Sequence, residues 1–200
     1  MFRKQLLFTM AASAMLIPLT AFAQEEGPSK QEFTVQALGS FVKTTTNNGV
    51  PQSATNSGGV LGTYRFFFNR YHGVEANYGY SLNTQSYGLP SGSLGVKSYS
   101  HEVTGAYVFR YPLARWTPFA LAGTGALIFD SKNLPGIDSQ ARAAFVYGAG
   151  GDFRLSRHVY VRAEYRGFVY NSPTFNLTGL AGADRTTHRA EPSIGFGYRF

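Results

Sequence analysis

The sequence contains no cysteine, and only 14% of its 200 residues are charged. The absence of cysteine excludes disulfides and also excludes a lipid-anchored cysteine behind a secretory signal. Beyond its first two dozen residues the chain has no run of about 18 apolar residues, which excludes a membrane-spanning helix there. Its basic residues are scattered and form no basic helix, so nucleic acid is not an expected partner.

The first residues have the organisation of a targeting segment. A short basic start precedes an apolar stretch at 6–19, and the residues AFA follow at 21–23. This order is typical of a cleaved secretory signal peptide. The alternative, an N-terminal transmembrane anchor, requires a longer apolar run, and Pro18 interrupts this one. We therefore expect residues 1–23 to be a cleaved signal peptide and residues 24–200 to form one domain.

The rest of the chain is rich in aromatic residues and glycine, and its apolar side chains recur at every second position. This period is typical of strands with two different faces. We expect eight strands, at 33–44, 57–68, 72–84, 96–111, 117–130, 142–154, 157–170 and 188–200. Each of them can supply the roughly 9–11 residues that a membrane-spanning strand needs.

The connections between these strands are alternately long and short. The long ones are rich in Asn, Ser, Thr, Gly and Pro, which favours loops, and they lie near 45–56, 85–95, 131–141 and 171–187. An up-and-down barrel that enters a membrane from one side has this rhythm. Its short turns and both chain ends lie on the near side, and its long loops lie on the far side.

The two faces of the expected strands differ in charge. One phase contains no Asp, Glu, Lys or Arg, and in the fifth strand we assign Phe119, Leu121, Leu127 and Phe129 to it. Its aromatic residues gather near both strand ends, like the girdles of membrane barrels. Those near the short turns are Phe66, Phe68, Phe109, Phe119, Phe153, Tyr198 and Phe200, and those near the long loops are Tyr80, Tyr99, Phe129 and Phe145. The opposite phase carries the charges, among them Asp152, Arg154 and Arg199.

Two kinds of barrel have one apolar and one polar face. A secreted calyx of the lipocalin kind places its apolar face inside, which here would crowd the whole uncharged phase into a narrow lumen. A membrane barrel turns that face outward. Because an Arg or Lys facing lipid at mid-depth costs about 2–4 kcal/mol, lipid requires an uncharged phase in every strand. The sequence therefore favours an all-β, eight-stranded antiparallel up-and-down transmembrane β-barrel.

The signal peptide, the loop rhythm, the charged interior and the aromatic end together resemble the small eight-stranded bacterial outer-membrane barrels, the OmpA-type transmembrane domain and its OmpX-like relatives. The resemblance covers residues 32–200 and implies a place in the bacterial cell outer membrane, among its lipids and lipopolysaccharide. Alternating apolar residues before a terminal aromatic also resemble the signal that the barrel-assembly machinery reads. Here that assembly signal would comprise Ile194, Phe196, Tyr198 and Phe200.

Side chains fill the lumen of a barrel with about eight strands. We expect a lumen charge network made of Arg65, Glu75, Glu102, Arg162, Glu164, Arg166, Arg189 and Glu191. The turn after Phe68 would place Arg65 nearly opposite Glu75. Because an unpaired buried charge is expensive, we interpret the network as a structural plug. The alternative is a gate, or a narrow porin-like channel for ions or small solutes.

Catalysis finds little support in the sequence. Ser100, His101 and Glu102 are consecutive, so their side chains point to opposite faces and cannot form a triad alone. The four histidines show no metal-ligand spacing. We expect no enzymatic activity, no metal and no cofactor, and a monomer with a structural, adhesive or surface-interaction role. An outer-membrane lipid A acyl hydrolase is a distant third possibility.

Basic residues occur on both sides of the expected barrel. Those on the short-turn side suit the anionic headgroups of the inner leaflet, and they are Arg70, Arg110, Arg115, Arg154, Arg157 and Arg199. Those on the long loops are Lys43, Lys97, Lys132 and Arg185. We expect the loop residues to meet lipopolysaccharide or another cell.

Overall fold

The computed structural model describes residues 30–43, 45–47, 50–89, 92–131, 139–172 and 186–200. All the regular elements among them are β-strands. No helix in these ranges is long and apolar enough to span a membrane. The expected signal peptide, residues 1–23, lies outside the described residues.

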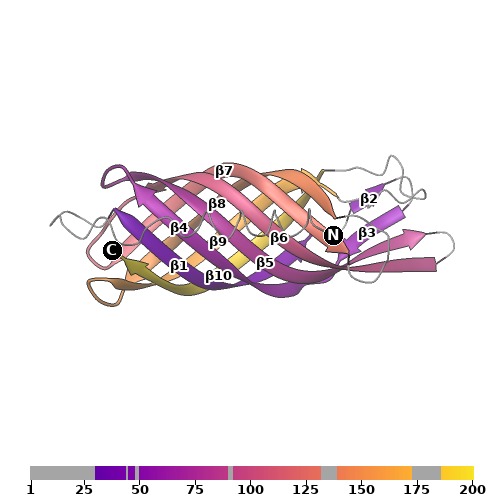
Figure 1. The fold of residues 1–200 in the computed structure, drawn as a ribbon, viewed down its shortest axis with the longest axis horizontal. Coiled ribbons are helices and arrows are strands. Elements are labelled where there is room, and N and C mark those ends of the chain that lie inside the picture. Colours follow the sequence, from indigo (N-terminus) through magenta and orange to yellow (C-terminus); the bar gives the residue numbers. More distant parts are fainter. Residues whose placement is uncertain (1–29, 44, 48–49, 90–91, 132–138, 173–185) are drawn as a thin grey trace, which may run out of the picture.

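Eight long strands form the wall of a closed barrel (Figure 1). They are β1 (Gln31–Val42), β4 (Ser57–Phe67), β5 (His72–Leu89), β6 (Gly92–Arg110), β7 (Trp116–Ser131), β8 (Gln140–Arg154), β9 (Val159–Asn171) and β10 (Thr186–Arg199). Each of the eight pairs antiparallel with the next one in this series, and β10 returns to pair with β1. The predicted eight-stranded antiparallel up-and-down barrel is therefore confirmed.

The long connections contain more strand than we expected. Two short strands, β2 (Thr45–Asn47) and β3 (Val50–Ala54), lie inside the expected loop 45–56, and β3 pairs with the far end of β5. The expected loop at 85–95 is wrong, because β5 and β6 stay paired through most of it. Its polar composition indicated a loop, but ladder hydrogen bonds satisfy the backbone equally well. Figure 1 shows this hairpin projecting at the end of the barrel opposite the C terminus.

The uncharged phase faces outward in every barrel strand except β7. Typical outward side chains are Val35, Val60 and Phe196, which are 55%, 56% and 66% exposed. In β7 our assignment is wrong. The residues that we placed outside lie in the lumen and are at most 5% exposed, namely Phe119, Leu121, Leu127 and Phe129.

The register explains why β7 is turned this way. The one charged residue of β7, Asp130, lies near the end of the strand and on the phase that faces outward, so charge does not mark the inward face of this strand. Phe119 lies opposite Arg110 of β6, and Thr117 lies opposite Asp152 of β8. Residues directly opposite each other share a face of the sheet, and both charged partners are buried in the lumen. The large side chains of β7 therefore fill the interior, and small ones such as Ala120 face outward.

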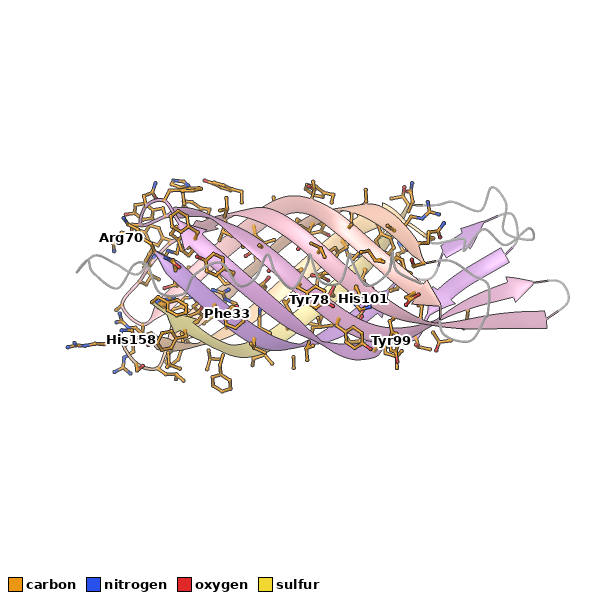
Figure 2. All side chains as sticks on the ribbon, in the orientation of Figure 1. Phe33, Arg70, Tyr78, Tyr99, His101 and His158 are labelled. Carbon is orange, nitrogen blue, oxygen red and sulfur yellow. The ribbon has the colours of Figure 1, made fainter. Side chains whose placement is uncertain are left out.

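Aromatic side chains gather on the outer face near both ends of the barrel. Those exposed at the short-turn end are Phe66, Phe68, Phe109, Trp116, Phe153, Tyr198 and Phe200. Towards the long-loop end, Tyr80 packs against Tyr99 and His101, with ring centroids 5.4 and 5.2 Å apart. Figure 2 shows Arg70 and His158 at the short-turn end, and Tyr99 and His101 nearer to the other end. Phe119 and Phe129 are not members of these girdles, because they point into the lumen.

Candidate functional site in the barrel lumen

Twelve charged side chains of the described residues are joined by ion pairs inside the barrel. The structure places all eight predicted lumen residues there, each at most 5% exposed: Arg65, Glu75, Glu102, Arg162, Glu164, Arg166, Arg189 and Glu191. Four more charged residues take part, namely Glu32, Arg110, Asp152 and Arg199. Six carboxylates thus face six guanidinium groups, and the formal charges of the twelve cancel.

Arg166 is the centre of the larger group of ion pairs. Its Nη1 lies 2.5 Å from Glu102 Oε1, its Nη2 lies 3.4 Å from Glu191 Oε1, and its Nε lies 3.7 Å from Glu164 Oε1. Arg189 completes this arrangement, with Nη2 2.7 Å from Glu191 Oε2 and 3.4 Å from Glu102 Oε2. Two arginines from neighbouring strands therefore share two carboxylates, and Arg166 also reaches a third.

Arg65 extends this central group towards the short turns. It lies directly opposite Glu75 in the register of β4 and β5, and its Nε donates to Glu75 Oε2 at 2.6 Å. Its Nη2 is 3.4 Å from Glu164 Oε2 on the far wall. Asn77 donates to the other oxygen of Glu75 at 2.8 Å. The central group therefore contains four carboxylates and three guanidinium groups.

A second group of ion pairs lies nearer to the short turns, around Glu32 and Asp152. Glu32 accepts hydrogen bonds from Arg110 at 2.5 Å, Arg199 at 2.9 Å and Arg162 at 3.1 Å. Asp152 accepts from Arg162 at 2.7 Å and from Arg199 at 3.2 Å. With two carboxylates and three guanidinium groups, this group offsets the opposite imbalance of the central one.

The sequence contained signals for both acids that our predicted network left out. Asp152 and Arg162 are ten residues apart across a short turn, as are Arg65 and Glu75, and each pair is directly opposite in its register. Glu32 has the same strand phase as the inward Gln36, so extending the expected first strand by one residue would have placed it in the lumen.

Aromatic rings inside the lumen support the guanidinium groups. The ring of Phe119 lies close to both Arg65 and Arg162, whose Cζ atoms are 4.0 and 5.0 Å from its centroid. Phe168 lies 5.3 Å from the Cζ atom of Arg166 and 5.4 Å from that of Arg189. Such contacts add attraction between a cation and a ring face. We assigned Phe119 to the lipid face, so this role escaped the sequence-based prediction.

Several ion pairs join strands that are not neighbours in the wall. Around the barrel, β6 is four strands away from β10 and three strands away from β9 and from β1. Nevertheless Glu102 of β6 contacts Arg189 of β10 and Arg166 of β9, and Arg110 of β6 contacts Glu32 of β1. These side chains therefore meet across the interior.

Another part of the lumen wall carries hydroxyl and amide groups. On β1, β4 and β5, the buried polar atoms without a hydrogen-bond partner are Gln36 Nε2, Ser40 Oγ, Ser57 Oγ, Thr63 Oγ1, Asn77 Oδ1 and Ser81 Oγ. Buried polar groups in folded proteins are normally satisfied by protein or by ordered water. This side of the lumen therefore has unused capacity to bind water.

The three consecutive residues considered for catalysis lie on different sides of the wall. Ser100 and Glu102 are buried in the lumen, where they contact Arg189. His101 lies on the outer face, and its Nδ1 is 2.9 Å from the hydroxyl of Tyr78. Among the described residues, no three His, Asp or Glu side chains are grouped as metal ligands. Arg154, which we expected in the lumen, is exposed at the rim and donates a hydrogen bond to the carbonyl of Ala114.

The four residues of the expected assembly signal lie in a row on the outside of β10 and just beyond it. Ile194, Phe196, Tyr198 and Phe200 are 60%, 66%, 45% and 47% exposed. The Tyr198 and Phe200 rings pack edge to face with centroids 5.1 Å apart, and the Phe200 N–H donates to the carbonyl of Gln31 at 3.1 Å. This row follows the seam at which β10 meets β1.

Solved structures show where this architecture occurs. The chain is similar to the outer membrane protein OprG from Pseudomonas aeruginosa, with 14% identity and a TM-score of 0.62 over 88% of this chain and 99% of that chain. It is also similar to Neisserial surface protein A, with 13% identity and a TM-score of 0.63 over 88% and 100% of the two chains. Ail, the attachment invasion locus protein of Yersinia pestis, has 19% identity and a TM-score of 0.52, over 87% and 100%.

Because the sequence identities to these solved structures are below 20%, the similarities show the fold alone. A search of curated proteins gave no match. The family model described as the outer membrane protein β-barrel domain matches residues 9–200. This match covers nearly the whole sequence, so the chain belongs to the family of outer membrane protein β-barrel domains, and the protein lies in the bacterial outer membrane.

Proposed function

We propose that the protein is a non-enzymatic outer-membrane barrel with a structural, adhesive or surface-interaction role, and that its lumen is plugged. The observation that supports the plug best is the set of ion pairs between strands from different sides of the wall. Glu102 of β6 lies 3.4 Å from Arg189 of β10, which is four strand intervals away around the barrel. Fully buried charges held this way favour a filled interior over a water-filled one.

The long-loop end supports a surface role. β5 and β6 have 18 and 19 residues, whereas a tilted strand crosses the bilayer with about 9–11. The excess forms a hairpin, to which β3 adds a further strand. The related barrel Ail was solved in complex with the heparin analogue sucrose octasulfate. We propose that this projecting sheet is the part of the present protein that meets lipopolysaccharide or another cell.

Conductance across a planar lipid bilayer tests the plug. We expect the purified wild-type protein to give no stable unitary openings, because side chains from opposing walls are in contact. A matched pair of variants, Glu164→Gln in the network and Asp130→Asn outside it, separates lumen effects from surface effects. Stable wild-type openings that disappear in Glu164→Gln but persist in Asp130→Asn would overturn the plug.

That outcome would instead support the second candidate function, a narrow channel for ions or small solutes. The unpartnered hydroxyl and amide atoms of β1, β4 and β5 favour it, because water bound along them would form a polar path beside the ion pairs. In that case Thr63→Val should reduce the unitary conductance, since it removes a hydroxyl from this wall without altering its shape.

We further propose that residues 1–23 are removed on secretion, and that residues 24–200 fold as one monomeric barrel with the help of the barrel-assembly machinery. The outward row Ile194, Phe196, Tyr198 and Phe200 would carry the assembly signal. Its exposure in the folded wall supports this, because the side chains are available for recognition before lipid covers them.

The assembly signal is tested with Phe200→Ala and the control Phe33→Ala, which changes an aromatic residue of similar exposure opposite Tyr198 on β1. We expect the amount of Phe200→Ala at the cell surface to fall several-fold, while Phe33→Ala stays near the wild-type level. The unfolding free energies of the two purified variants should differ little, because each loses one lipid-exposed ring. Normal surface levels of Phe200→Ala would contradict the proposal.

A further inference from the structure

A pocket opens on the outside of the barrel at the short-turn end, away from the ion pairs of the lumen. Its volume is about 340 Å³, which is within the range of small-molecule sites. The residues that line it are Arg115, Phe153, Arg154, Leu155 and Ser156. They come from the end of β8, the turn that follows it, and the turn that precedes β7.

Backbone hydrogen bonds fix the two turns relative to each other. The Arg154 N–H donates to the carbonyl of Arg115 at 2.9 Å, and the Arg154 guanidinium donates through Nη2 to the carbonyl of Ala114. In the turn after β8, the Leu155 N–H donates to the carbonyl of Val159 at 3.0 Å, and Ser156 Oγ accepts from the Val159 N–H at 3.1 Å. The pocket is therefore formed before any ligand arrives, which lowers the entropic cost of binding.

The surroundings of the pocket are strongly cationic. Exposed basic residues at this end are Lys30, Arg70, Arg115, Arg154 and Arg157. The short turns at 68–71, 111–115 and 155–158 contain no acidic residue. The acids closest to this end, Glu32 and Asp152, are buried in the lumen and paired with arginines there. The two arginines of the pocket thus lack a carboxylate partner among the described residues.

The walls of the pocket are apolar on the side that faces lipid. Phe153 and Leu155 are 43% and 56% exposed, and Trp116, directly opposite Phe153 in the register, is 44% exposed. Tryptophan at such a position marks the boundary between hydrocarbon and headgroups. A free phosphate ion would not contact these apolar side chains, whereas a phospholipid would contact both the apolar side chains and the arginines.

We propose that this pocket binds the headgroup of an anionic phospholipid in the inner leaflet of the outer membrane. Its phosphate contacts Arg115 and Arg154, and one of its acyl chains lies along Phe153. Short turns of such barrels face the periplasm, so the inner leaflet is the one within reach. Arginine suits this role because its fork of donors matches phosphate oxygens. The site would attach a defined lipid to the barrel at the β7–β8 edge.

Native mass spectrometry of the folded barrel in detergent tests this site, with phosphatidylglycerol and phosphatidylcholine of equal chain length as probes. We expect one phosphatidylglycerol to stay bound under conditions that remove phosphatidylcholine. The Arg115→Gln/Arg154→Gln variant should lose about tenfold or more of that bound population, since hydrogen bonds to charged groups are at stake. Arg115→Gln alone, which keeps the Arg154 bond to Ala114, should lose part of it.

The matched control is Arg70→Gln/Arg157→Gln, which removes the same charge from the same end outside the pocket lining. It should lose less than about twofold, because dispersed charge contributes little at one site. Equal losses of bound phosphatidylglycerol in the two double variants would show diffuse electrostatic attraction in place of a defined site. Equal retention of both lipids by the wild type would also overturn the proposal. Displacement of phosphatidylglycerol by glycerol phosphate would reduce the site to a phosphate site without a lipid chain. Unchanged heat-modifiable gel mobility shows that each variant is folded.

Discussion

Replacing Arg166 with methionine is expected to lower the unfolding free energy of the barrel by about 3–5 kcal/mol, the usual cost of removing one partner of a buried ion pair. Arg166 contacts Glu102, Glu164 and Glu191, and its side chain is fully buried. Its loss leaves four carboxylates with two guanidinium groups in the central group. Methionine fills much of the volume, so the effect reports charge more than packing. Urea unfolding from lipid vesicles, followed by the fluorescence of Trp116, measures it; Trp116 is the one tryptophan of the sequence.

Two further variants serve as controls for the unfolding free energy of Arg166→Met. Arg157→Met removes an exposed arginine from a short turn and should change the unfolding free energy by less than about 0.5 kcal/mol. Adding Glu191→Gln to Arg166→Met removes one of the uncompensated carboxylates and should restore part of the lost stability. If Arg166→Met unfolds like the wild type, the lumen ion pairs do not hold the barrel together, and the plug loses its energetic basis.

Replacing Gly195 with valine is expected to keep most of the protein from closing its barrel. Gly195 lies opposite Gln36 at the seam between β10 and β1. A Cβ atom at this position would overlap the backbone of β1, at the carbonyl of Val35 and the Cα of Gln36. Backbone cannot move aside as a flexible side chain can, so we expect a cost of about 3 kcal/mol or more. The fraction that keeps its compact mobility in an unheated gel measures the outcome.

Gly62→Val is the matched control for this substitution. Gly62 is also a barrel glycine, but a Cβ atom there would meet nothing nearer than the carbonyl oxygen of Tyr78 at 3.8 Å. Its side faces lipid, which accepts valine, so Gly62→Val should fold as well as the wild type. Equal folding of Gly195→Val and Gly62→Val would show that the seam can separate enough to admit a side chain, against the tight closure described above.

The sequence predicted the fold well because lipid and water impose a simple rule on strands. Charged residues such as Arg65, Glu164 and Glu191 mark the inward phase, and alternation then places the rest of each strand. The rule fails on β7, whose one charged residue, Asp130, lies near the strand end on the outward phase. On β7 the choice between Phe119 and Ala120 depended on register with β6 and β8, which is a tertiary property that no single segment contains.

The ion pairs of the lumen were also predictable only in part from the sequence. Pairs across a short turn, such as Arg65 with Glu75, follow from register alone. Pairs across the lumen do not, because the contact of Glu102 with Arg189 depends on the tilt and closure of the whole wall. For the same reason the ring of Phe168 could be placed inside but not paired with its cations.

The position of Glu32 has a consequence for the path by which the protein enters the membrane. This carboxylate belongs to the first strand, yet its partners Arg110, Arg162 and Arg199 lie 78, 130 and 167 residues further along the chain. A sheet that inserted strand by strand would carry this charge without any of these partners until β6 arrived, and without the full set until β10 arrived, and unpaired charge within a bilayer is costly. Stepwise entry is therefore disfavoured, and the late strands must already be near the first when the charge leaves water. We therefore expect membrane insertion and completion of the ring to be a single cooperative event.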